Sequence, residues 1–187
     1  MFDGAGRVFQ NCYVVDDLDK AIEHWIKTIG AGPFFVNRKL DNLEIEYRGK
    51  PSGIDIDFAL GQAGPIHIEL IQDNSKNPTV YNDMYPKGSG GGFHHVGMLA
   101  KDFEAAVSAY EDAGCERGMI GMFGSTPFAY MDTRSSVGFF TEFHHDTAEI
   151  RALFDGVEAA SKDWNGERPV RPMSELLEGP RDPANAR

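Results

Sequence analysis

An internal duplication is the feature of this sequence that most restricts its fold. The segments FQNCYVVDDLDKAIEHW (residues 9–25) and FHHVGMLAKDFEAAVSAY (residues 93–110) share one pattern: an apolar extended run, an aspartate suited to cap a helix, and apolar residues at helical spacing. The segments PIHIELIQD (residues 65–73) and GFFTEFHHD (residues 138–146) also align. Because related patterns begin and end each half, the sequence predicts two copies of one module.

Each copy has the pattern of a strand, a helix and then two or three further strands. We therefore predict an α+β fold of two tandem βαβββ modules, residues 1–73 and 93–146, that form a cupped, partly closed mixed sheet. Residues 74–92 are rich in Gly, Pro, Asn and Ser, which is typical of a linker. Residues 147–187 should form a helix on the outside of the sheet, followed by an extended or poorly ordered tail from Asn165.

Composition excludes several classes of function. A net charge of -11, with only 18 Lys and Arg residues among 187, argues against nucleic acids and anionic membranes as partners. Cys12 and Cys115 are too few for a disulfide framework, and no apolar run is long enough to span a bilayer. The N-terminal segment lacks the pattern of a signal peptide, so we expect a cytoplasmic protein that acts on small molecules.

Four polar residues occupy equivalent places in the two copies. Gln10 and His95 lie on the opening strands, and Glu69 and Glu142 lie on the closing strands. On the concave face of a cupped sheet these side chains would converge. Two carboxylates, an imidazole and an amide oxygen are suitable ligands for a divalent cation and would leave positions open for substrate.

The segments QNCYVVDDLDKAIEHW, IHIELIQ, HVGMLAKDFEAAV and MDTRSSVGFFTEFHH, in this order, resemble the vicinal oxygen chelate superfamily. That superfamily includes glyoxalase I, methylmalonyl-CoA epimerase, extradiol dioxygenases and bleomycin-resistance proteins, and the resemblance covers roughly residues 7–146. It implies that Gln10, Glu69, His95 and Glu142 are the metal ligands. Their order is similar to that of the zinc-type glyoxalase I set, which makes zinc the favoured metal, with nickel, cobalt, manganese and iron as alternatives.

The resemblance also implies a reaction. Two neighbouring substrate oxygens would bind the metal, and a proton would leave the carbon next to a carbonyl, as in an isomerase, an epimerase or a glyoxalase-type lyase. Glu142 is the expected base, and Glu69 is expected to return the proton. The expected partner is a small molecule with vicinal oxygens, and members of the superfamily are often dimers, so we expect a homodimer.

Two other uses of the fold stay open. Extradiol dioxygenases hold ferrous iron with two histidines and one carboxylate, but here Gln10 occupies the first histidine position and Glu69 is an additional acid. Bleomycin-resistance proteins bind their ligand without a metal set. The segment DTRSSVG (residues 132–138) replaces a turn that many relatives carry, which indicates a different substrate.

Alternation along the strands supplies candidate substrate contacts. His67, His144 and Phe140 each lie two residues from an aligned glutamate, so their side chains should face the cup. Cys12 shares that face with Gln10 and is expected to pack rather than react. Arg134 is the remaining predicted contact, as a cation able to meet an anionic substrate group, together with Arg38, Arg48 and Lys50 as weaker candidates.

The other histidines are expected to lie away from the site. His94 and His145 alternate with the cup-facing residues, so they should point to the opposite face, against a helix or solvent. His24 lies on the first helix and should be structural or exposed.

Overall fold

One continuous sheet forms the centre of the molecule. The computed structural model describes residues 6–177. The strands within this range are β1 (Val8–Val14), β2 (Phe34–Leu40), β3 (Glu44–Tyr47), β4 (Lys50–Gly53), β5 (Ile56–Ala63), β6 (Ile66–Asp73), β7 (Gly92–Ala100), β8 (Glu116–Phe123), β9 (Thr126–Asp132), β10 (Phe140–His145) and β11 (Val170–Pro172). The helices are α1 (Leu18–Ile29), α2 (Val80–Met84), α3 (Phe103–Asp112), α4 (Arg134–Val137), α5 (Ala148–Ser161) and α6 (Ser174–Leu177).

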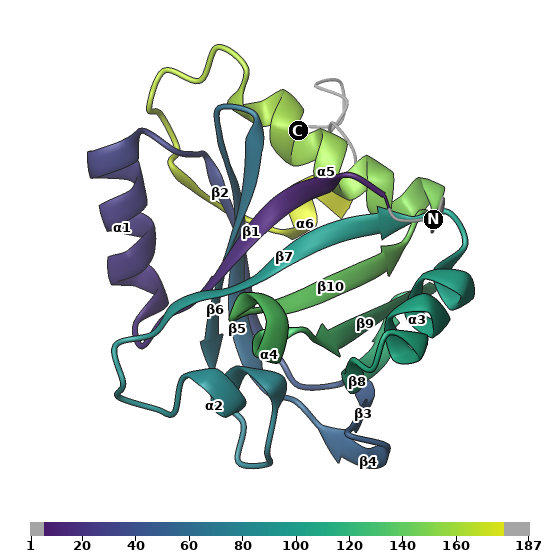
Figure 1. Cartoon of the computed structure of the whole chain (residues 1–187). Coiled ribbons are helices and arrows are strands. Elements are labelled where there is room, and N and C mark those ends of the chain that lie inside the picture. The colour runs from purple at the N-terminus through teal and green to yellow at the C-terminus, as the bar shows by residue number, and fades with distance from the viewer. Residues whose placement is uncertain (1–5, 178–187) are drawn as a thin grey trace.

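The order of strands confirms the predicted fold class. It is β11-β2-β5-β6-β1-β7-β10-β9-β8-β3-β4, which is a mixed and open sheet. Apart from β3 and β4, the strands of the first copy occupy one half of the sheet and those of the second copy occupy the other half. The halves meet where β1 pairs antiparallel with β7, so both opening strands lie at the centre (Figure 1).

A hairpin from the first copy crosses to the second. Strands β3 and β4 lie between β2 and β5 in sequence, yet β3 pairs antiparallel with β8 at the far edge of the sheet. The link between β2 and β3 therefore spans the open side of the cup. The sequence indicated an extended segment here but not this partner. The division into residues 1–73, 74–92, 93–146 and 147–187 stays a prediction.

Apolar residues on the two faces of the sheet form separate cores. On the convex face α1 packs on the first half and α3 on the second. Both helices begin as predicted, because Asp17 and Asp102 accept a hydrogen bond from a backbone N–H of the first turn. The largest cluster lies on the concave face and includes residues of β5, β9 and α5.

The last segment departs from expectation. Helix α5 was predicted on the outside of the sheet, but its buried residues Ile150, Leu153, Phe154 and Val157 belong to the concave cluster. The predicted extended tail contains β11, which pairs parallel with β2, and α6, which contacts α5. Met173, which joins β11 to α6, is buried. Apolar residues at helical spacing indicated the helix correctly, but that spacing alone does not specify which face of a sheet a helix covers. Residues 178–187 of the predicted tail lie outside the described residues. No helix in the described part of the chain is long and apolar enough to cross a membrane.

Candidate metal centre

Four neighbouring strands bring the predicted ligands together on the concave face. Strands β6, β1, β7 and β10 are consecutive in the sheet. They carry, in the same order, Glu69, Gln10, His95 and Glu142. All four side chains come from one chain, so no second protein chain is needed to supply a predicted ligand.

The register between these strands arranges the side chains in two rows. In one row Cys12 lies opposite both Glu69 and His95. In the other row Gly97 is paired with Gln10 on one side and with Glu142 on the other. A Cβ atom at Gly97 would lie 2.4 Å from Gln10 Oε1, which is closer than any real contact. The glycine therefore leaves the space that the Gln10 amide occupies.

The polar atoms of the set are close together and buried. His95 Nε2 lies 3.0 Å from Glu142 Oε2 and 3.3 Å from Glu69 Oε2. These three atoms and Gln10 Oε1 are inaccessible to solvent and have no hydrogen-bond partner. Buried polar groups almost always have partners, so a group of four unpaired atoms needs an explanation. A divalent cation bound by two carboxylate oxygens, one imidazole and one amide oxygen would satisfy all four, and this donor set fits such an ion.

The neighbour of Gln10 fixes the orientation of its amide. Gln10 Nε2 donates a hydrogen bond to His67 Nδ1 over 3.1 Å in the buried interior. The amide nitrogen is therefore turned toward His67, and Oε1 is left free on the other side. Burial lowers the pKa of His67 to about 3, with a further contribution from His144, so the ring is neutral and its Nδ1 can accept the bond. His67 thus supports a candidate ligand and does not line the pocket.

A β-bulge places both members of the histidine pair inside the cup. The register shifts where Cys12 is paired with His95 but Tyr13 with Phe93, so that His94 is the additional residue in β7. The His94 ring is fully buried and stacks on Phe140, with 5.0 Å between ring centroids. The prediction that His94 points to the opposite face is therefore wrong, because a bulge interrupts strict alternation.

His94 also determines which nitrogen of His95 is free. Its Nε2 lies 3.0 Å from the carbonyl oxygen of Val80, which can only accept, so His94 carries its proton on Nε2. Burial, together with the nearby His95, lowers the pKa of His94 to about 3, so its Nδ1 is an acceptor. That atom lies 2.9 Å from His95 Nδ1, which must then donate. The lone pair of neutral His95 is therefore on Nε2, which faces the carboxylates.

The charges of the cluster depend on one another. Burial lowers the pKa of His95, but Glu142 and Glu69 outweigh burial and raise it to about 9. For Glu142, burial raises the pKa, whereas His144 and His95 outweigh burial and lower it well below the usual range of a carboxylic acid. His144 Nε2 lies 3.1 Å from Glu142 Oε2. Two imidazoles thus hold a buried carboxylate in its charged form, and a cation at the same place would have the same effect.

Sequence reasoning missed one further donor. The ligand atoms of Cys12, Glu69 and His95 lie within 4.8 Å of one another. Cys12 was expected only to pack, and its side chain is fully buried. Burial raises the pKa of the thiol, and Glu69 and Glu142 raise it further. Without a cation Cys12 is therefore a neutral thiol, which agrees with the packing role.

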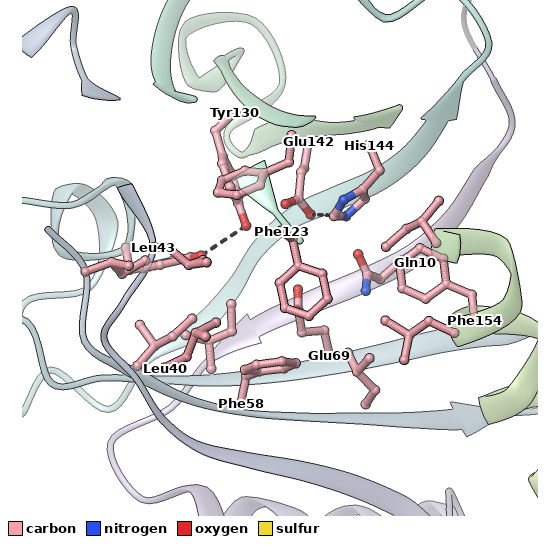
Figure 2. Close-up of a pocket in the computed structure, with 18 residues that line it drawn as sticks. Gln10, Leu40, Leu43, Phe58, Glu69, Phe123, Tyr130, Glu142, His144 and Phe154 are labelled. Atoms are coloured by element: carbon pink, nitrogen blue, oxygen red, sulfur yellow. Dashed lines mark hydrogen bonds and ion pairs between the residues drawn. The ribbon is translucent and has the colours of Figure 1, made fainter. Parts of the chain in front are cut away.

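The candidate centre forms the inner end of a pocket in the cup. The pocket encloses about 550 Å³, counting the solvent at its mouth. Gln10, Glu69, Glu142 and His144 line this end, and the other lining residues are apolar or aromatic (Figure 2). His144 therefore lies where the sequence predicted a substrate contact. His95 lies beneath the lining residues.

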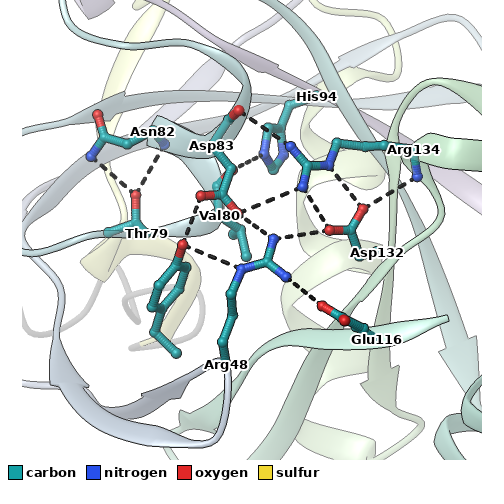
Figure 3. A network of polar contacts seen from close by, with 10 residues as sticks. Arg48, Thr79, Val80, Asn82, Asp83, His94, Glu116, Asp132 and Arg134 are labelled. Atoms are coloured by element: carbon teal, nitrogen blue, oxygen red, sulfur yellow. Dashed lines mark hydrogen bonds and ion pairs between the residues drawn. The ribbon is translucent and has the colours of Figure 1, made fainter.

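Two predicted contacts lie outside this pocket. Phe140 is fully buried beneath His94. Arg134 is separated from the concave face by Phe140, because its guanidinium lies over that ring at 4.7 Å from the centroid. It donates two hydrogen bonds to Asp132 and one to the carbonyl oxygen of Asp83 (Figure 3).

Two of the three weaker cationic candidates are also engaged, whereas Lys50 is exposed on β4. Arg48 donates to Asp83, Asp132 and Glu116, and these bonds connect β3, α2 and β9 (Figure 3). Arg38 is paired with Asp19 and Asp57 on the exposed side of β2. The structure therefore places these arginines in ion pairs within the protein.

The outer histidines lie as predicted. His24 is exposed on α1. His145 faces the convex side, where its ring lies 6.3 Å from that of Phe103 on α3. Side chains alternate regularly along β10, and the predicted faces of His144 and His145 are therefore correct. The same rule fails in β7, because that strand contains a bulge.

Comparison with known proteins identifies the family and the fold. The sequence profile described as "Glyoxalase/Bleomycin resistance protein/Dioxygenase superfamily" matches residues 9–130. The search of curated protein sequences found no match.

Solved structures share the fold at low sequence identity. A hypothetical protein from Bacillus halodurans has a TM-score of 0.55 at 14% identity and covers 76% of this chain and 95% of its own. Methylmalonyl-CoA epimerase of Streptomyces coelicolor has a TM-score of 0.51 at 16% identity and covers 77% of this chain and 99% of its own. Because the profile matches well over half of the residues, the chain belongs to the glyoxalase, bleomycin-resistance and dioxygenase superfamily.

Proposed function

We propose that this protein is a divalent-metal-dependent enzyme that transfers a proton at the carbon next to a carbonyl group, as an isomerase, an epimerase or a glyoxalase-type lyase does. The observation that carries the proposal is the group of four buried, unpaired donor atoms at the inner end of an apolar pocket. Gln10, Glu69, His95 and Glu142 would hold the ion. A bound ion would supply Lewis-acid polarisation of a substrate carbonyl oxygen.

The proposal assigns the proton exchange to the two carboxylates. Glu142 and Glu69 come from opposite halves of the sheet, and both line the pocket. A substrate bound between them would present one face to each. We propose that Glu142 accepts the proton from the substrate, that the proton passes by way of solvent to Glu69, and that Glu69 delivers it to the other face, so that both carboxylates are charged again after each turnover.

Metal analysis and proton exchange test this function. The purified protein should bind one equivalent of Zn²⁺ in titration calorimetry. In deuterated water the loaded protein should exchange the α-proton of a hydroxy ketone, which proton NMR measures directly. Glu142→Gln should abolish exchange, whereas Glu104→Gln, a matched change at an exposed site on α3, should leave it intact. Full exchange by metal-loaded Glu142→Gln would exclude Glu142 as the base.

One observation favours a second function, that of a ferrous dioxygenase. His144 supplies a second imidazole within 3.1 Å of Glu142 Oε2, and its Nδ1 is buried without a partner. His95, His144 and Glu142 together have the composition of a two-histidine, one-carboxylate iron site. Oxygen consumption with a catechol, present with Fe²⁺ and absent with Zn²⁺, would identify this function in place of proton transfer.

Assembly and location belong to the same proposal. We infer a cytoplasmic homodimer that acts on a small molecule with vicinal oxygens, on the strength of the superfamily alone. Light scattering on the purified protein would report the mass of two chains, and a single-chain mass would refute the dimer.

A further inference from the structure

The walls of the pocket are apolar apart from the candidate ligand set, His144 and the hydroxyls of Tyr81 and Tyr130, which are hydrogen-bonded to each other. Fourteen of the eighteen lining residues are aliphatic or aromatic, and none of the eighteen is Lys or Arg. The four exceptions all lie at the inner end (Figure 2). A ligand that fills the pocket therefore meets carboxylates, an imidazole and an amide at one end only, and elsewhere meets carbon apart from two paired hydroxyls.

Several segments supply these walls, among them strand β5. Leu40 ends β2 and Leu43 lies in the link between β2 and β3 that crosses the cup, and Phe123 and Phe128 come from β8 and β9. Helix α5, which lies beyond the residues matched by the superfamily profile, adds Ile150, Leu153 and Phe154. Helix α5 and the link between β2 and β3 thus extend the apolar surface from the candidate centre toward the mouth of the pocket.

The arginines nearest to the second half of the sheet cannot balance a negative ligand. Arg48 has three carboxylate partners, and Arg134 is bonded to Asp132 and to a backbone carbonyl. Each is held by the half-buried carboxylates of Asp83 and Asp132, so turning either arginine toward a ligand would break ion pairs within the protein. A phosphate or carboxylate in the outer pocket would therefore lose its hydration without gaining a partner.

The charge at the inner end leads to the same conclusion. Two carboxylates neutralise a divalent ion, and the ring of His95 bound through Nε2 is neutral. The loaded centre therefore has no excess positive charge to attract an anionic substrate. It offers coordination to neutral oxygens, and the pocket offers contact to an apolar body.

We propose that the substrate is an uncharged molecule with an aromatic or polycyclic body and two adjacent oxygens, such as a hydroxyl beside a ketone. This inference rests on the metal-dependent function proposed above, because the two oxygens are assigned to the metal. The apolar body lies along the aromatic walls between α5 and the β2–β3 link. Acyl-CoA thioesters, which carry several phosphates, are excluded from this site.

Three probes that each carry two oxygens able to chelate a metal, but that differ in the remainder of the molecule, test this assignment. Benzoin carries a hydroxyl beside a ketone between two phenyl groups, and acetoin carries the same oxygens between two methyl groups. Acetoacetyl-CoA offers two carbonyl oxygens on a polyanionic carrier. Titration calorimetry with the Zn²⁺-loaded protein should give a Kd for benzoin at least about 100-fold lower than for acetoin, since each apolar carbon group of a ligand changes binding by roughly tenfold or more. Acetoacetyl-CoA should bind no better than acetoin.

A charge placed in the apolar wall tests the contribution of the wall to binding separately from that of the metal. Leu43 is only half-buried, so Leu43→Asp is compatible with the fold. This variant should weaken benzoin binding by more than tenfold and leave the affinities for Zn²⁺ and acetoin within twofold. Val137→Asp, at an exposed apolar position on α4, serves as the matched control and should leave all three affinities unchanged.

The outcomes separate this inference from the proposed function. If Zn²⁺ binds and acetoin exchanges its α-proton, but acetoin or acetoacetyl-CoA binds as tightly as benzoin, the substrate class is refuted and the metal-dependent function stands. If Zn²⁺ does not bind, the proposed function fails, and this inference fails with it. Unchanged benzoin binding by Leu43→Asp would also refute the assignment of the apolar wall.

Discussion

The substitution His94→Phe should weaken metal binding although His94 is not a predicted ligand. Phenylalanine preserves an aromatic ring for stacking on Phe140 but removes both ring nitrogens. His95 Nδ1 then loses the acceptor that lies 2.9 Å away, and the carbonyl oxygen of Val80 loses its donor. His95 becomes free to rotate or to carry its proton on Nε2, the atom that faces the carboxylates.

Two independent estimates give the size of the effect. A buried hydrogen-bonding group left without its partner costs about 1–3 kcal/mol. Loss of a residue that orients a metal-binding histidine typically lowers metal affinity about 10- to 100-fold, which corresponds to roughly 1.4–2.8 kcal/mol. We therefore expect the Kd for Zn²⁺ to rise about 10- to 100-fold at neutral pH. Competition with a chromophoric chelator measures this change without any assay of activity.

Two companion variants make the test specific. In His94→Asn the side-chain oxygen lies where Nδ1 was and can accept from His95, so affinity should recover at least in part. His145→Phe makes the same chemical change on the convex face and should have no effect on Zn²⁺ binding. A Kd for His94→Phe within twofold of the parent protein would refute the argument that His94 sets the free nitrogen of His95.

Three further predictions follow from the geometry. Gly97→Ala should lower Zn²⁺ affinity at least tenfold in the same competition assay, because its Cβ would displace the amide of the adjacent glutamine; Gly53→Ala, where the nearest atom would be 3.6 Å away, should not. Saturating Zn²⁺ at 100 times its Kd should raise the free energy of unfolding by about 2.7 kcal/mol, and a chelator should remove that increase in a thermal-shift assay. Arg134 and Arg48 outweigh burial and hold the pKa of Asp132 at about 2, below its ordinary 3.8, so this carboxylate stabilises the fold above pH 4 and ceases to do so as the pH falls toward 2. Asp132→Asn should therefore cost about 1 kcal/mol at pH 7, after allowance for solvent screening, and almost nothing at pH 2, whereas exposed Asp112→Asn should be neutral at both in urea titrations.

Alternation along regular strands explains what could be predicted from the sequence. The period of two placed Gln10, Glu69 and Glu142 on one face, and adjacent strands in the repeat placed them side by side. The same rule failed for His94, because a bulge adds a residue to one strand and no local signal in the sequence marks it.

Contacts between distant segments explain most of the remainder. The partner of β3, the cover supplied by α5 and the ion pairs of Arg134 all depend on segments far away in the sequence. Spacing of apolar residues predicts that a helix or strand exists, but its neighbours are selected by the packing of the whole chain. The apolar character of the pocket was therefore beyond prediction, although each of its aromatic residues is visible in the sequence.

The crossing hairpin has a consequence for how the duplicated chain is made. During synthesis the first copy leaves the ribosome with β3 able to pair only with β4, because its partner residues Met119–Gly121 in β8 have not yet been translated. Until they emerge, Leu40 and Leu43 have no pocket to enclose, and the concave face stays open to other chains. The hairpin that the first copy contributes to the second thus makes the two copies depend on each other to complete the sheet and the pocket.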